Sequence, residues 1–188
     1  MKHVPLPGLV HHGSRTSFSQ QEFGVREISD RSGRYFYRKW AAHPFQRILV
    51  VRLDSLGDVL MTTAVVAGLR QKYPNAEITM LTKRRFVAVY HGVPYADHVL
   101  DDGCYTLQAS VQRRRFDIAI NLQDHEAGLR IVRDANAGVR LGLDERLMSQ
   151  DSRLRRERAA RKEHLVDIMA RMAGVTPYRT YWRVDEHE

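Results

Sequence analysis

The chain has 188 residues, enough for one α/β domain with an additional segment but too few for two full domains. No stretch approaches the roughly 18 consecutive apolar residues of a membrane-spanning helix, so the composition argues against an integral membrane protein. The net charge of +8 predicts an anionic partner, without distinguishing nucleic acid, phospholipid and phosphorylated metabolites.

Residues 1–46 show neither helical nor strand periodicity and mix proline, glycine, serine and glutamine with scattered aromatic side chains, so we expect a basic, mostly flexible arm. The N-terminus lacks the continuous apolar segment of a secretory signal. The single cysteine, Cys104, excludes an intrachain disulfide and a cysteine-based zinc site. We therefore expect a protein of the reducing cytoplasm.

The pattern changes at Arg47, where a sequence of alternating strands and helices begins. The apolar run at residues 48–51 predicts a central parallel strand buried on both faces, followed by a tight turn and a helix over residues 59–73. Further strands are predicted at residues 76–81, 97–100, 116–122 and 139–141, with helices at 84–91, 107–114 and 126–135 between them. This alternation predicts an α/β fold with a doubly wound parallel sheet.

The C-terminal part begins with a basic segment at residues 151–163, which continues into an amphipathic helix ending near Gly174. Pro177 prevents the helix from continuing. We place the end of the domain at residue 175 and interpret residues 176–188 as a tail or an interdomain connector.

A group of polar residues follows the first predicted strand, and ligands of open α/β sheets bind at the carboxyl ends of strands. Gly57 is the only glycine there, so neither a dinucleotide fingerprint nor a P-loop is present. Asp58 allows two interpretations: a residue that satisfies free N–H groups at the helix start, or a general base that accepts a proton from a hydroxyl. The residues alone leave both open.

A second polar group, Asn121 to Glu126, ends the predicted strand at residues 116–122 and would face the same edge. Consecutive residues at a helix start point in different directions, so we expect Asp124, His125 and Glu126 to form hydrogen bonds rather than bind a metal. The basic runs at residues 113–115 and 153–162 are either solvated faces or phosphate-binding segments.

A family resemblance is carried by four strings in order: RILVVRLDSLGDVLMTTAVVAGLRQKYP at residues 47–74, then AEITMLT, FDIAINLQ and EHLVDIMARMAGV. They resemble the heptosyltransferases of glycosyltransferase family 9, bacterial enzymes that build the inner core of lipopolysaccharide. The resemblance covers residues 47–175 and implies the N-terminal, acceptor-side half of a GT-B enzyme. It implies an inverting, metal-independent transfer without a resident cofactor, in which an acceptor hydroxyl attacks an ADP-sugar.

The resemblance also implies roles for single residues. Asp58 becomes the catalytic base, and the acceptor-binding candidates are Arg52, Asp54, Ser55, Gly57, Gln123, Asp124 and His125. The implied acceptor is an anionic, lipid-linked saccharide at the inner face of the plasma membrane, and the basic runs are further candidates for contacting it.

The family's donor domain would lie beyond this chain. We therefore expect poor binding of ADP-heptose by the chain alone, which would be either a truncated product or the partner of a second chain that carries the donor domain. A non-catalytic module that binds an anionic lipid or sugar is the alternative. Nucleic-acid binding rests on the charge alone, so we do not favour it.

Overall fold

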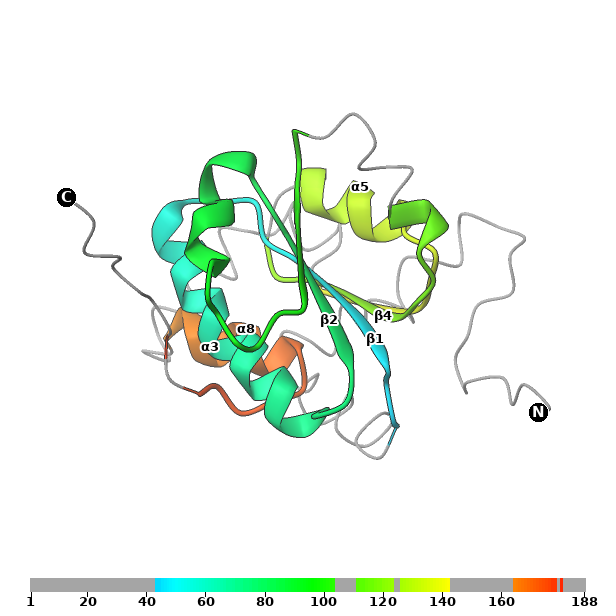
Figure 1. Cartoon of the computed structure of the whole chain (residues 1–188), viewed down its shortest axis with the longest axis horizontal. Helices are drawn as coiled ribbons and strands as arrows, with labels where there is room; N and C mark the ends of the chain where they lie inside the picture. Colours follow the sequence, from blue (N-terminus) through cyan, green and yellow to red (C-terminus); the bar gives the residue numbers. More distant parts are fainter. Residues whose placement is uncertain (1–42, 104–110, 124–125, 143–163, 179, 181–188) are drawn as a thin grey trace, which may run out of the picture.

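The computed structural model describes residues 43–103, 111–123, 126–142, 164–178 and 180. These residues form a sheet of five parallel strands in the order β3-β2-β1-β4-β5 (Figure 1). The strands are β1 (Arg47–Val51), β2 (Glu77–Thr82), β3 (His98–Asp101), β4 (Phe116–Asn121) and β5 (Ala137–Gly142). The connecting segments include α3 (Leu56–Lys72), the 3-10 helix η1 (Arg84–Tyr90) and α5 (Glu126–Asp134), and α8 (Leu165–Met172) follows the last strand.

The central strand β1 pairs with β2 on one side and β4 on the other, with Val51 opposite Leu81 and Asn121. From β1 the chain moves outward to β2 and β3, and then returns to place β4 and β5 on the opposite side of β1. The strand order therefore reverses between β1 and β4. In open parallel sheets this switch point, at the carboxyl ends of the strands, is where ligands bind.

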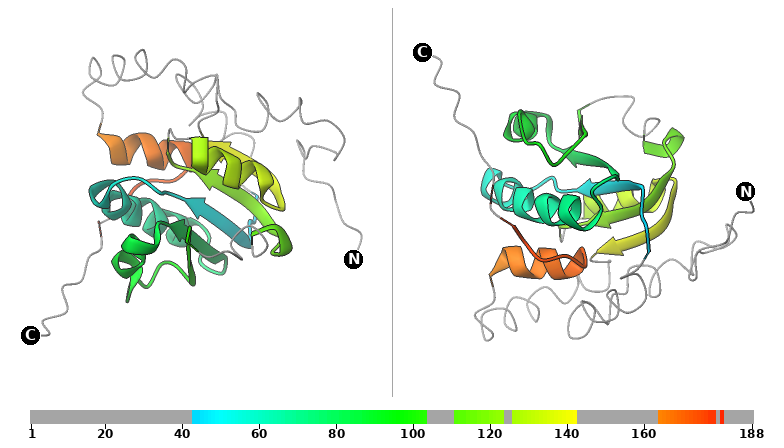
Figure 2. Two further views of the ribbon diagram at one scale, coloured as in Figure 1. Left: turned by 90° about the horizontal axis from the view of Figure 1, so that it is seen from above. Right: turned by 60° about the horizontal axis from the view of Figure 1, so that its bottom comes forward.

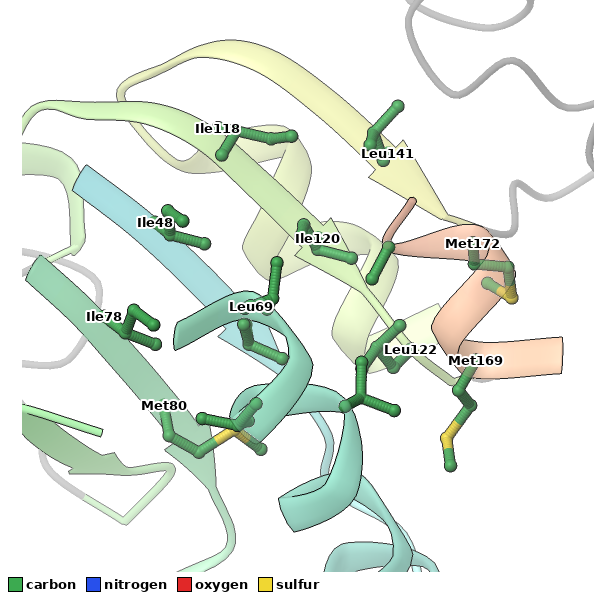
Figure 3. Packing of buried hydrophobic residues seen from close by; sticks show 14 of the residues in the cluster. Ile48, Leu69, Ile78, Met80, Ile118, Ile120, Leu122, Leu141, Met169 and Met172 are labelled. Carbon is green, nitrogen blue, oxygen red and sulfur yellow. The ribbon is translucent and has the colours of Figure 1, made fainter. Parts of the chain in front are cut away.

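Helices cover both faces of the sheet. Successive side chains of a strand point to opposite faces, so each buried strand contributes apolar side chains to both layers. Ile48 and Val50 pack into the larger cluster with α3 and α8, part of which Figure 3 shows from close by. Leu49 and Val51 belong to the second cluster, together with Leu129 of α5. Figure 2 shows α8 beside α3. The predicted doubly wound α/β fold is thus confirmed.

Most of the predicted elements recur with small shifts, whereas the predicted helix at residues 107–114 lies partly outside the described residues. Helix α3 begins at Leu56, three residues before the predicted start, because Ser55 is the N-cap in an extended conformation and its carbonyl accepts a hydrogen bond from Val59 N at 3.0 Å. The predicted helix at residues 84–91 is a 3-10 helix. Gly174 has a φ of 66°, which confirms it as the left-handed residue that ends α8.

Packing extends beyond the predicted domain boundaries. Phe45 is buried against the ring of Tyr73, with ring centroids 5.6 Å apart, and Gln46 N donates to Asp117 Oδ2 at 2.7 Å. After α8, Tyr178 N donates to the carbonyl of Ala64 in α3 at 3.0 Å. The remainder of the predicted arm, the basic run at residues 153–162 and the end of the tail lie outside the described residues. In the described part, no helix is long and apolar enough to cross a membrane.

Candidate active site

Arg52, the first residue after β1, lies at the centre of a charged cluster. Its side chain is only 7% exposed, and its Nη2 lies 3.1 Å from Asp58 Oδ2 and 3.3 Å from Asp54 Oδ2. Its Nη1 donates to the carbonyl of Leu122, which follows β4. One guanidinium therefore connects the carboxyl ends of β1 and β4 with the start of α3.

Asp58 is the third residue of α3, and both of its side-chain contacts are on one carboxylate oxygen. Oδ2 pairs with Arg52 and accepts a hydrogen bond from Ser55 Oγ at 2.9 Å. Among the described residues, no backbone N–H group donates to this carboxylate, so it does not cap a free N–H at the helix start. Its side chain is 24% exposed, and a hydroxyl-bearing ligand at this edge of the sheet could reach it.

The backbone of the first turn of α3 is held by neighbouring side chains. Thr62 Oγ1 donates to the carbonyl of Asp58 at 2.8 Å, and Tyr90 OH donates to the carbonyl of Val59 at 3.3 Å. Burial raises the pKa of the Tyr90 hydroxyl, with the nearby positive charge of Arg52 acting in the opposite direction. Tyr90 is therefore a neutral donor behind the charged cluster.

Gln123 supports the turn from the β4 side. Its Oε1 accepts a hydrogen bond from Leu53 N at 2.6 Å, and its own N–H donates to Asn121 Oδ1 at 3.4 Å. The residue is 1% exposed. Helix α5 passes so close that a Cβ at Gly128 would lie 2.1 Å from Gln123 Nε2. The buried Gln123 amide thus holds the loop after β1 in place by accepting a hydrogen bond from its backbone.

The structure brings most of the predicted site residues together. Arg52, Asp54, Ser55 and Asp58 are in direct contact, and Gln123 lies below their turn. Gly57 is exposed, with nothing within 4 Å of the position that a Cβ would take. Asp124 and His125 fall outside the described residues. Within the described ranges, no group of three histidine, cysteine or acidic side chains could hold a metal ion.

The predicted basic run at residues 113–115 lies at the wrong edge for this site. It directly precedes β4, and Arg114 Nη1 lies 3.5 Å from Glu77 Oε1 at the first residue of β2. The strands are parallel, so their amino ends lie about 20 Å from their carboxyl ends at roughly 3.3 Å per residue. The run therefore lies at the edge of the sheet opposite to Asp58.

Three other basic residues follow β2 at the carboxyl edge, and we call Lys83, Arg84 and Arg85 the basic triplet. Arg84 and Arg85 are exposed, and the guanidinium of Arg85 lies 4.7 Å from the ring centroid of Phe86. Lys83 comes two residues after Leu81, which is level with Val51 in the sheet. This group was not predicted from the sequence, although its place directly after a predicted strand was an available signal.

Comparisons with protein-family models and with curated proteins give no match to the sequence. Solved structures do match the fold. The chain is similar to a glycosyl transferase family 9 protein from Veillonella parvula DSM 2008, with a TM-score of 0.60 and 22% identity over 75% of this chain and 45% of that protein. It is also similar to the E. coli heptosyltransferase WaaC with ADP, with a TM-score of 0.56 and 20% identity over 72% of this chain and 48% of that protein.

The chain thus spans about half the length of the enzymes that it matches. At these levels of identity the likeness establishes the fold, and the predicted resemblance to heptosyltransferases is confirmed at that level.

Proposed function

We propose that this chain forms the acceptor-side half of a glycosyltransferase and that Asp58 is its general base. The observation that carries the proposal is a partly exposed carboxylate at the switch point between β1 and β4, in a fold that known glycosyltransferases share. A base must lie within hydrogen-bond reach of the proton that it removes, and this edge of the sheet is where a ligand would lie.

In the proposed reaction, an acceptor hydroxyl attacks the anomeric carbon of a nucleotide-activated sugar. The new C–O bond forms as the bond to the nucleoside diphosphate breaks, with inversion at that carbon, and Asp58 takes the hydroxyl proton. The donor is an ADP-sugar, ADP-heptose by the resemblance, and a further domain or a second chain holds it. The step needs no metal, so a chelator should leave transfer unchanged.

The proposed acceptor is an anionic, lipid-linked saccharide presented at the inner face of the plasma membrane. The basic triplet supports this choice because it lies at the same edge of the sheet as Asp58. Each well-placed cation contributes about 1 kcal/mol at an anionic surface. Membrane contact would therefore be peripheral and electrostatic.

The test of Asp58 is sugar transfer from ADP-heptose to a Kdo-bearing lipid A acceptor. Because the compared enzymes are about twice as long, the donor-side half of E. coli WaaC is supplied as a separate chain. We expect Asp58→Asn to lower transfer by at least about 100-fold with unchanged acceptor binding. Asp134→Asn, at the far end of α5, is the matched control. Full transfer by Asp58→Asn would refute the base assignment.

The test of the acceptor class is binding of the same lipid to the chain alone. Replacing the basic triplet by alanines should weaken binding on the order of 100-fold, because three charges at about 1 kcal/mol each are lost. The same replacement at residues 113–115 removes as much charge from the opposite edge and should change binding much less. Equal losses in the two variants would mean that the lipid responds only to net charge.

A further inference from the structure

We infer that Arg52 is a positioning residue, which fixes Asp58 through Oδ2 and so leaves Oδ1 as the oxygen that takes the acceptor proton. The inference rests on the proposed function, in which Asp58 is the base. It replaces the sequence-based expectation that Arg52 binds the acceptor.

The contacts of Arg52 leave little of it for a ligand. Nη1 donates to the carbonyl of Leu122, and Nη2 forms ion pairs with the carboxylates of Asp54 and Asp58. Nε is buried, so a ligand could not reach it. The side chain is 7% exposed, so an acceptor at the protein surface would meet the carboxylates before the guanidinium. These acceptors come from two segments of the chain, the turn from Asp54 to Asp58 and the end of β4, and the rigid, planar fork of arginine suits such an arrangement.

The two oxygens of Asp58 differ in their contacts. Oδ2 receives Arg52 Nη2 at 3.1 Å and Ser55 Oγ at 2.9 Å. Oδ1 has no donor within hydrogen-bond distance among the described residues, so its lone pairs are available. Two donors on one oxygen also restrict rotation of the carboxylate, and this holds Oδ1 in one direction without occupying it.

This arrangement assigns the proton in the proposed step. The acceptor O–H proton moves to Oδ1 as the acceptor oxygen bonds to the anomeric carbon and the diphosphate leaves with the electron pair of the broken bond. Arg52 keeps its own protons throughout. Its contribution is orientation, which matters because small displacements of a catalytic group cost large factors in rate.

The experiment compares Arg52→Gln and Arg52→Lys in the assay with the donor-side half, each with and without Asp58→Asn. We expect Arg52→Gln to lower kcat by 10-fold or more, on the scale of a misplaced catalytic group, with little change in the acceptor KM. Arg52→Lys, which keeps the charge, should retain part of the rate. In the Asp58→Asn background, Arg52→Gln should have no further effect, because a positioning residue acts through the base.

The inference is overturned if Arg52→Gln mainly raises the acceptor KM, or if it lowers kcat by the same factor in the Asp58→Asn background. The first result would make Arg52 a contact of the acceptor, and the second would show that Arg52 acts independently of Asp58. Arg70→Gln is the matched control, since Arg70 also pairs with an aspartate, Asp97, and donates to backbone carbonyls at the other end of α3. It should lower stability without changing kcat.

A urea-unfolding cycle on the chain alone separates this inference from the proposed function. If Arg52 holds Asp58, the midpoint of the double variant, Arg52→Gln with Asp58→Asn, should shift by less than the summed single shifts. Additive shifts would overturn the positioning role even if transfer depends on Asp58. Coupled shifts, with transfer unaffected by Asp58→Asn, would refute the proposed function and leave the contact in place.

Discussion

Replacing Gly128 of α5 with alanine tests how tightly the candidate site is braced from within. A Cβ at this position would lie 2.1 Å from Gln123 Nε2 and 2.6 Å from Asn121 Oδ1. To reach an ordinary contact of 3.4 Å, the Gln123 amide must move by more than 1 Å. Its Oε1 accepts the 2.6 Å hydrogen bond from Leu53 N, which such a movement would break.

The expected free-energy change combines three contributions. Alanine in place of glycine inside a helix stabilises by about 1 kcal/mol. Overpacking costs about 1–3 kcal/mol, and a buried N–H group left without an acceptor costs a further 1–3 kcal/mol, roughly. The net result is a loss of about 1–5 kcal/mol in the free energy of unfolding, although alanine is the better helix former.

The assay is urea unfolding of the chain followed by circular dichroism, with Gly57→Ala as the matched control. Gly57 also lies in a helix but has nothing within 4 Å of a Cβ, so alanine there should leave stability unchanged or raise it by up to about 1 kcal/mol. A Gly128→Ala variant as stable as the original chain would refute the reasoning, since the amide would then have room to move at no cost.

Two further predictions concern charged groups away from the site. Burial alone would raise the pKa of the Asp97 carboxyl, but hydrogen bonds from a backbone N–H and from Arg70, together with the nearby charges of Arg70 and His98, hold the pKa below its usual 3.8. The contribution of the ionised Asp97 to the free energy of unfolding is complete above the pKa that Asp97 has in the unfolded chain. It is lost as the pH falls through the lower pKa of the folded protein, so Asp97→Asn should flatten the decline of the unfolding free energy in acid. The buried guanidinium of Arg140 donates to three carbonyls around the end of α5, so Arg140→Met should cost about 2–4 kcal/mol in thermal or urea unfolding. Arg130→Ala, which removes an ion pair from a side chain that is 68% exposed, should cost less than about 0.5 kcal/mol. Equal losses of stability in the Arg140 and Arg130 variants would refute the idea that burial makes the Arg140 contacts more important.

The candidate site was only partly visible in the sequence. The turn from Asp54 to Asp58 could be placed, because it follows a fully apolar strand and precedes a helix. The burial of Arg52 could not, because an arginine in a loop usually faces solvent and its partner Leu122 lies 70 residues away. The hydrogen bond from Leu53 N to Gln123 Oε1 was not predicted either, because it also joins residues 70 positions apart in the sequence.

The order of the strands and helices along the chain could be read from local patterns in the sequence. Local patterns report burial: the unbroken apolar run in β1 reflects a strand covered on both faces, and the residues around Gly174 reflect a helix end. Which strands are neighbours, and which edge of the sheet each charged group occupies, follows from the folded structure. It separated residues 113–115 from the basic triplet, because the edge of a parallel sheet depends on whether a residue precedes or follows its strand. It also brought the guanidinium of Arg52 to Asp58, because contacts between segments depend on the packing of the whole sheet.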